Sequence, residues 1–197
     1  MSIINKDNYL GTSINYTYYS YSNERIHKNL INILDIFKNK VKEIESINDN
    51  NYGKKSDAIL KIIEKELLAS GFITETNKKN QVRIQLSQEK EVKEFRVDAI
   101  NPKTGIIIEI EAGRAVSNYQ FLKDMIECSM ISSKKLIYLN KEKTNISNDL
   151  FLVIAVRNIY YFSGQKHNDY KTVKKCLKAL DISKLNLKIK GILLIGY

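Results

Sequence analysis

The 197-residue sequence lacks tryptophan and contains only one proline, eight glycines and two cysteines. Cys128 and Cys176 are too few for a disulfide-stabilised scaffold or for a zinc site built from several thiolates. Both fall at apolar positions of expected helices, which indicates reduced core residues in a cytoplasmic protein. No apolar run approaches the roughly 20 residues of a membrane-spanning helix, and the first ten residues show no secretory pattern. We therefore expect no membrane partner.

Motifs for nucleotide binding and for nucleophilic catalysis are also missing. The sequence contains no P-loop, no GxGxxG segment and no GxSxG segment. Its two histidines, His27 and His167, are isolated, and without a pair of thiolates they do not make a zinc site. These absences argue against a nucleotide-binding enzyme, a zinc enzyme and an enzyme with a nucleophilic serine.

Positive charge is in surplus, with 32 lysines and arginines against 22 aspartates and glutamates. A surplus of this kind favours a polyanionic partner such as nucleic acid, although an AT-rich genome would enrich lysine equally well. Residues 165–190 alone hold eight lysines and two aspartates. These lysines are candidate contacts to a DNA backbone, or else they form a solvated helix face. Four of them share one face of the helix expected over about 169–180: Lys171, Lys174, Lys175 and Lys178.

Length and patterning predict a single domain over residues 1–197. We expect three segments within it: an N-terminal arm and helix, a core, and C-terminal strands with the basic helix. They cover residues 1–55, 56–140 and 141–197 respectively. The tyrosine-rich residues 1–22 predict either a short hairpin or a loosely held arm. Residues 23–47 repeat apolar side chains at three- and four-residue spacing, which predicts an amphipathic helix.

The core segment alternates between helical and strand patterns. Its order is a helix, three strands, a helix and a strand, and two of the strands are joined by a turn containing Pro102 and Gly105. This order predicts an α/β fold in which a mixed central sheet is flanked by helices. The expected ranges are 56–70, 81–86, 94–100, 106–112, 117–131 and 135–139.

Acidic residues interrupt two of these strands. In the segment 106–112, Glu109 and Glu111 alternate with isoleucines and share one face of the strand. Asp98 lies on the neighbouring strand of the expected hairpin, so three carboxylates can converge. Carboxylates in such a group repel one another, which raises their pKa values or recruits a cation, and their oxygens suit Mg²⁺. The alternative is a strand with one solvated acidic face.

Glu66 lies in the middle of the apolar stripe of the helix expected over 56–70. An acid in that position is costly unless it has a partner, and a metal site or a positioning role would supply one. Alternatively, Glu66 lies at the edge of the stripe and turns outward, or pairs with Arg83 or Arg96.

Asp98, ten intervening residues and then Glu109-Ile110-Glu111 resemble the motif of the PD-(D/E)XK nuclease superfamily, the fold of restriction endonucleases. The resemblance covers roughly residues 56–140. It implies a restriction-endonuclease-like core and Mg²⁺-dependent hydrolysis of DNA. It also implies that Asp98 and Glu109 are metal ligands in the catalytic site. Glu111 stands where the family usually has lysine, so it would serve as a further ligand or as a general base. Glu66 would match the auxiliary acid of the preceding helix.

These observations together predict a Mg²⁺-dependent endonuclease, most closely a type II restriction endonuclease that acts on a short site in double-stranded DNA. A homodimer would place one active site on each strand, with the helix over 23–47 as a candidate dimer element. Arg114 is expected to contact a phosphate near the acids. The alternatives are a repair or junction nuclease, the nuclease subunit of a defence system, or a catalytically inactive DNA-binding module.

Overall fold

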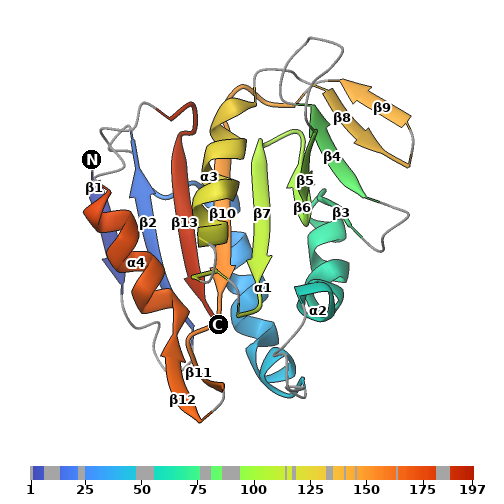
Figure 1. The fold of residues 1–197 in the computed structure, drawn as a ribbon. Coiled ribbons are helices and arrows are strands. Elements are labelled where there is room, and N and C mark those ends of the chain that lie inside the picture. Colours follow the sequence, from blue (N-terminus) through green and yellow to red (C-terminus); the bar gives the residue numbers. More distant parts are fainter. Residues whose placement is uncertain are drawn as a thin grey trace.

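The structure of the chain is a computed structural model. Its described residues form an α/β/α arrangement, in which a mixed sheet lies between two layers of helices (Figure 1). The predicted fold class, a mixed central sheet flanked by helices, is thereby confirmed. The structure describes residues 2–6, 14–21, 25–47, 56–75, 81–85, 94–113, 115–116, 119–131, 135–139, 141–144, 146–162, 164–180 and 187–197.

The large sheet of the described residues has seven strands in the order β1-β2-β13-β10-β7-β6-β3. Its centre is parallel, because β10 pairs with β7 on one side and with β13 on the other. The outer pairings are antiparallel, and the N-terminal residues form the hairpin β1–β2, one of the two predicted alternatives. The strands are β1 (Ser2–Lys6), β2 (Asn15–Ser20), β3 (Ile73–Thr74), β6 (Ala99–Asn101), β7 (Ile106–Glu111), β10 (Phe151–Val156) and β13 (Gly191–Gly196).

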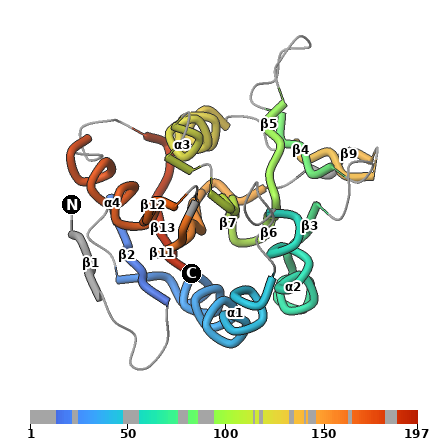
Figure 2. Tube along the Cα trace, turned by 60° about the horizontal axis from the view of Figure 1, so that its bottom comes forward, coloured from blue at the N-terminus to red at the C-terminus, as the bar shows by residue number. Residues whose placement is uncertain are grey.

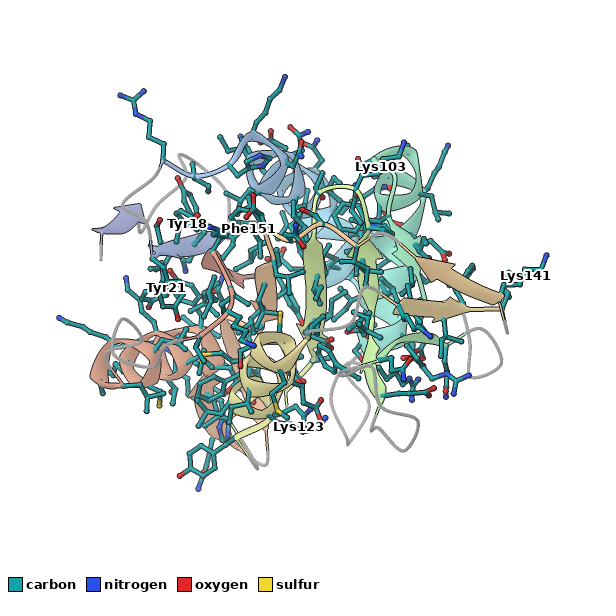
Figure 3. The ribbon with its side chains drawn as sticks, turned by 90° about the horizontal axis from the view of Figure 1, so that it is seen from above. Tyr18, Tyr21, Lys103, Lys123, Lys141 and Phe151 are labelled. Atoms are coloured by element: carbon teal, nitrogen blue, oxygen red, sulfur yellow. The ribbon has the colours of Figure 1, made fainter. Side chains whose placement is uncertain are left out.

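Helices cover both faces of this sheet. Figure 3 looks along the sheet from above, with α1 and α2 on one side and α3 and α4 on the other. Ile108 and its neighbours two residues away pack toward α1 and α2, whereas Ile107 packs toward α3 and α4. The apolar stripe of α1 is buried in this packing within the chain. The helices are α1 (Lys28–Glu45), α2 (Ser56–Ala69), α3 (Gln120–Met130) and α4 (Asp169–Ala179).

A smaller sheet, in the order β5-β4-β8-β9, packs beside α3 (Figure 2). The strand expected over 94–100 is therefore two strands in two sheets. The chain leaves the small sheet after Val97, bends at Asp98, and enters the large sheet at Ala99. The small sheet comprises β4 (Val82–Gln85), β5 (Glu94–Val97), β8 (Lys135–Tyr138) and β9 (Lys141–Thr144).

A two-stranded hairpin of β11 (Ile159–Phe162) and β12 (Gln165–Asn168) connects β10 to α4 and was not predicted. The start of α3 also differs from the expectation. The helix begins at Gln120 after Tyr119, which adopts a left-handed backbone with φ of 51° and makes no side-chain cap. The expected helix start at Ser117 lies outside the described residues.

Two expectations concern the environment of the chain. Cys128 is buried and Cys176 is partly buried, and both are free. None of the helices in the described ranges combines the length and the apolar character needed to cross a lipid bilayer.

Candidate active site

The carboxylates of β7 lie at the carboxyl end of the central parallel strands. β7 and β10 run in register, so Glu109 lies beside Ile154 and Glu111 beside Val156. The alternation of side chains along β7 places both glutamates on the face that α3 covers. Glu109 is buried with 8% of its surface exposed, whereas Glu111, at the strand end, is partly exposed.

Asp98 reaches the same site from the bend between the two sheets. Its Oδ2 accepts a hydrogen bond of 2.7 Å from the backbone N–H of Ile110, which lies between the two glutamates. This bond ties the bend to β7 and fixes the carboxylate next to the glutamates. Asp98 therefore lies beside the part of β7 that carries Glu109 and Glu111, and its charge contributes to the raised pKa of both glutamates.

A fourth acid, Asp124 of α3, completes the cluster and was not predicted. It is only 2% exposed, and its Oδ1 accepts a 2.9 Å hydrogen bond from the side chain of Gln120. Asp124 lies three residues after buried Phe121 and four before buried Cys128, so it occupies the apolar stripe of its helix. Glu66 was singled out in the sequence as an acid in the apolar stripe of a helix, and the same reasoning applied to α3 would have found Asp124.

Lys123 brings a positive charge to the edge of this cluster. Its Nζ lies 3.4 Å from Glu127 Oε2 and 3.9 Å from Asp124 Oδ1, while about half of the side chain remains exposed. The lysine also lowers the pKa values of Glu109, Glu111 and Asp124. The exposed part of Lys123 lies on the solvent side of α3, and its long side chain reaches along the helix surface to the acids.

Burial is the main cause of the raised pKa values in the cluster. Desolvation raises the pKa of Asp98 to about 7 despite the hydrogen bond from Ile110. Desolvation and the charges of Asp124 and Asp98 raise the pKa of Glu111 to about 8, and desolvation raises that of Asp124 to about 6. The pKa of Glu109 is raised well above its ordinary value by burial and by the neighbouring acids. The cluster therefore holds protons near neutral pH or gains stability from a cation.

Two oxygens of the cluster have no hydrogen-bond partner among the residues that the structure describes. They are the buried atoms Glu109 Oε1 and Asp124 Oδ2. Unpaired buried carboxylate oxygens are the donors that a hard cation such as Mg²⁺ binds, so the donor set fits this ion chemically. However, the described residues contain no group of three His, Cys, Asp or Glu side chains arranged to hold a metal as they stand. The three-ligand site therefore stays a prediction.

Glu66 is not brought to these acids. It belongs to α2, which covers the opposite face of the large sheet. Its Oε1 lies 3.3 Å from Lys40 Nζ of α1, and 37% of the side chain is exposed. The position of Glu66 between two apolar neighbours is explained by this ion pair between helices. Of the two arginines considered as partners, Arg83 pairs with Glu94 and Arg96 with Glu75.

The basic residues proposed from the sequence have different positions. Arg114 lies outside the described residues. The four lysines of α4 follow its outer side, where three are exposed and Lys174 is partly buried, with its Nζ 5.9 Å from the ring centre of Tyr170. They lie on the α3 side of the large sheet, on a neighbouring helix rather than within the carboxylate cluster.

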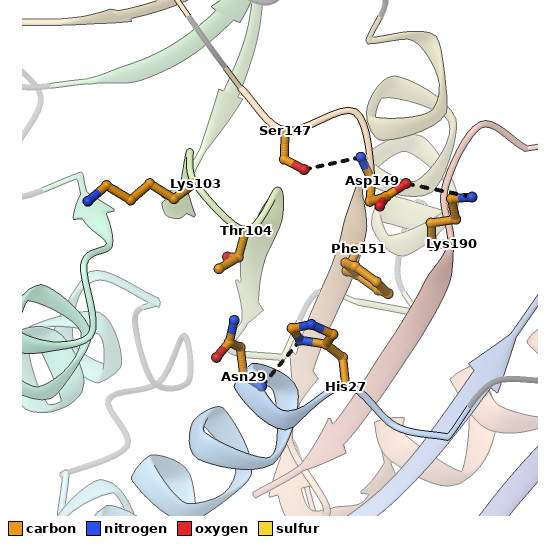
Figure 4. A pocket seen from close by; sticks show the side chains of 8 residues that line it. All are labelled: His27, Asn29, Lys103, Thr104, Ser147, Asp149, Phe151 and Lys190. Carbon is orange, nitrogen blue, oxygen red and sulfur yellow. Dashed lines mark hydrogen bonds and ion pairs between the residues drawn. The ribbon is translucent and has the colours of Figure 1, made fainter.

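A separate cavity of about 330 Å³ lies at the opposite end of the central strands, where β7, β10 and β13 begin (Figure 4). The turn between β6 and β7 forms one wall, with Lys103 exposed, and the segment around Asp149 forms another. Lys190 Nζ lies 3.6 Å from Asp149 Oδ1 at this cavity. The two walls are in close contact at Gly105. Its φ is 69°, and a Cβ at this position would clash with the carbonyl oxygen of Asp149. The cavity lies at the other end of β7 from Glu111.

Comparisons with known proteins identify the fold. The sequence matches no known protein family and no curated protein. Among solved structures, the chain is similar to the restriction endonuclease BglII in a crystal structure with a DNA 16-mer. The TM-score is 0.51 at 14% sequence identity, and the alignment covers 93% of this chain and 77% of that one. The carboxylate cluster at the carboxyl end of β7 is therefore built on a restriction-endonuclease-like fold.

Proposed function

We propose that the chain is a Mg²⁺-dependent endodeoxyribonuclease that hydrolyses phosphodiester bonds at a short specific site in duplex DNA, as a type II restriction endonuclease. One observation carries this proposal. A cluster of four acids with raised pKa values and unpaired buried oxygens lies where the central strands of a restriction-endonuclease-like fold end. Buried carboxylates with strongly raised pKa values are concentrated at functional sites, which supports the proposal.

Asp98 and Glu109 would hold the cation, because one is fixed by the backbone of β7 and the other has an unpaired oxygen. A Mg²⁺ ion held by these residues would supply neutralisation of the phosphate charge and stabilisation of the leaving oxygen. Glu111 has a pKa near 8, so its carboxylate accepts a proton from the attacking water effectively at mildly alkaline pH. The half-exposed ammonium of Lys123 hydrogen-bonds the phosphate at the rim.

The test is digestion of plasmid and phage DNA by the purified protein with Mg²⁺ or with EDTA. We expect discrete fragments with Mg²⁺ only. Asp98→Ala and Glu109→Ala should abolish them while DNA binding persists. Glu66→Gln is the matched control, because this acid lies in the opposite helix layer, and it should cleave like the wild type. Cleavage that survives Asp98→Ala would refute the assigned site.

Other outcomes favour the alternatives. A smear would indicate a repair, junction or nonspecific nuclease. The described residues have no preformed three-ligand group, and this observation favours a catalytically inactive DNA-binding module. Salt-sensitive DNA binding without cleavage at any Mg²⁺ concentration would support that module. We also propose that the active form is a homodimer, and light scattering during gel filtration would test its mass with and without DNA.

A further inference from the structure

The hairpin β11–β12 projects beside the carboxylate site. It begins directly after β10, whose last residue, Val156, pairs in register with Glu111. The base of the hairpin also approaches the segment that follows Glu111, since a Cβ on Gly113 would lie 3.8 Å from Tyr160 Oη and 3.9 Å from Arg157 Nη1. Figure 1 shows β11 and β12 below the ends of β13 and β10, at the same end of the sheet as the end of β7.

One face of the hairpin is anchored to the body of the protein. The Tyr160 ring stacks on His167 across the two strands with 5.2 Å between centroids, and the Arg157 guanidinium lies 4.0 Å from the centre of the Tyr160 ring. Tyr160 Oη donates to the buried carboxylate of Asp169 at the start of α4, 3.2 Å away. An isolated two-stranded hairpin is marginally stable in water, so these contacts hold it in a fixed position.

The other face is exposed. Side chains alternate along β11, so Ile159 and Tyr161 point away from the anchored face, and they are 57% and 69% exposed. Tyr161 pairs across the hairpin with Lys166, which is also exposed. Among the described residues, the side chains of Tyr161 and Lys166 have no hydrogen-bond or ion-pair partner, and the two residues are joined only through the strand pairing of the hairpin. A large aromatic side chain and a lysine are therefore presented together on the outer face of the hairpin.

We infer that this outer face of β11–β12, with Tyr161 and Lys166 at its centre, contacts the duplex DNA that enters the carboxylate site. The inference rests on the proposed function. A two-stranded ribbon fits the major groove of DNA, the Tyr161 ring packs against a base or sugar there, and the Lys166 ammonium pairs with a phosphate. The acid cluster repels phosphates, so a cation on the adjacent hairpin supplies the attraction that brings the backbone to it.

The experiment measures binding of a short fluorescein-labelled duplex of mixed sequence by anisotropy, in EDTA and at several salt concentrations. We expect Lys166→Ala to reduce the slope of log affinity against log salt by about 0.9, the contribution of one phosphate contact. Lys103→Ala is the matched control, because this exposed lysine lies at the opposite end of the central strands. The salt dependence of DNA binding by this variant should have the same slope as that of the wild type.

Tyr161 is tested in the same assay. Tyr161→Ala should weaken binding about ten-fold, whereas Tyr161→Phe should stay within about two-fold of the wild type, because packing needs the ring and not the hydroxyl. Both residues are exposed, so thermal unfolding should be unchanged. If the wild type cleaves DNA but the double variant Tyr161→Ala/Lys166→Ala binds and cleaves equally well, this inference fails and the proposed function stands. If the wild type neither binds nor cleaves, both fail.

Discussion

The substitution Asp98→Asn should stabilise the metal-free protein while it abolishes cleavage. Burial raises the pKa of Asp98 from 3.8 to about 7, so the folded state binds this proton more tightly than the unfolded chain. The stability associated with the protonated carboxyl is present below about pH 4 and is lost as the pH rises toward 7. At pH 8 the ionised carboxylate therefore penalises the folded state.

The size of this effect follows from the same values. Each unit of pKa corresponds to about 1.4 kcal/mol, so the penalty has an upper bound of about 4 kcal/mol. Coupling to the other acids and relaxation of the site reduce the gain that we expect to about 2 kcal/mol, or about 4–8 °C in Tm. Asparagine has the shape of aspartate, and its Oδ1 can still accept the bond from the Ile110 N–H.

The assay is thermal unfolding in EDTA at pH 8 and at several lower pH values. The stabilisation by Asp98→Asn should shrink steadily as the pH falls and disappear well below pH 4, where the wild-type carboxyl is protonated in both the folded and the unfolded state. Asp35→Asn, at an exposed position of α1, is the matched control and should leave Tm unchanged throughout. A variant that gains nothing at pH 8, or gains equally at all pH values, would show that the reasoning about the buried charge is wrong.

Three further predictions concern the site and the turn opposite it. Mg²⁺ should raise Tm of the wild type at pH 8 by binding the ionised acids, and Asp98→Asn should lose most of this rise in the same titration. Asp124→Asn should move the acidic limb of the pH–rate profile for cleavage to lower pH, because the charge of Asp124 raises the pKa of Glu111; an unmoved limb would exclude Glu111 as the base. Gly105→Ala should destabilise the fold by about 2–4 kcal/mol in urea unfolding, because the positive φ and the Asp149 carbonyl both exclude a Cβ; wild-type stability would contradict the locked turn.

Much of the fold was predictable because its central strands are strongly patterned. The segment around Glu109 alternates between isoleucines on one face and acids on the other, and the two cores of the structure divide along this alternation. The division of residues 94–100 into two strands was not predictable. The apolar alternation runs through Asp98 without a break, and only the pairing partners reveal that β5 and β6 belong to different sheets.

The candidate site was predictable in part for a similar reason. Strand periodicity and a hairpin turn place Asp98, Glu109 and Glu111 together, whereas helix residues depend on which layer each helix joins. A helical wheel places Glu66 next to apolar residues of α2, but it does not say that the side chain stays partly exposed or that α1 supplies Lys40 as its partner. Asp124 occupies an equally apolar stripe of α3, and its helix covers the face of the sheet that carries the acids.

The position of β13 has a consequence for the order in which the protein assembles. β13 lies between β2 and β10, although it is the last of the three to be synthesised. The hairpin β1–β2 is joined to the rest of the sheet only through β13, so it cannot take its place before Gly191–Gly196 has been synthesised. Long-range pairing of this kind slows folding and leaves strand edges exposed to association with other chains. We expect refolding to be slow and its yield to fall with rising protein concentration.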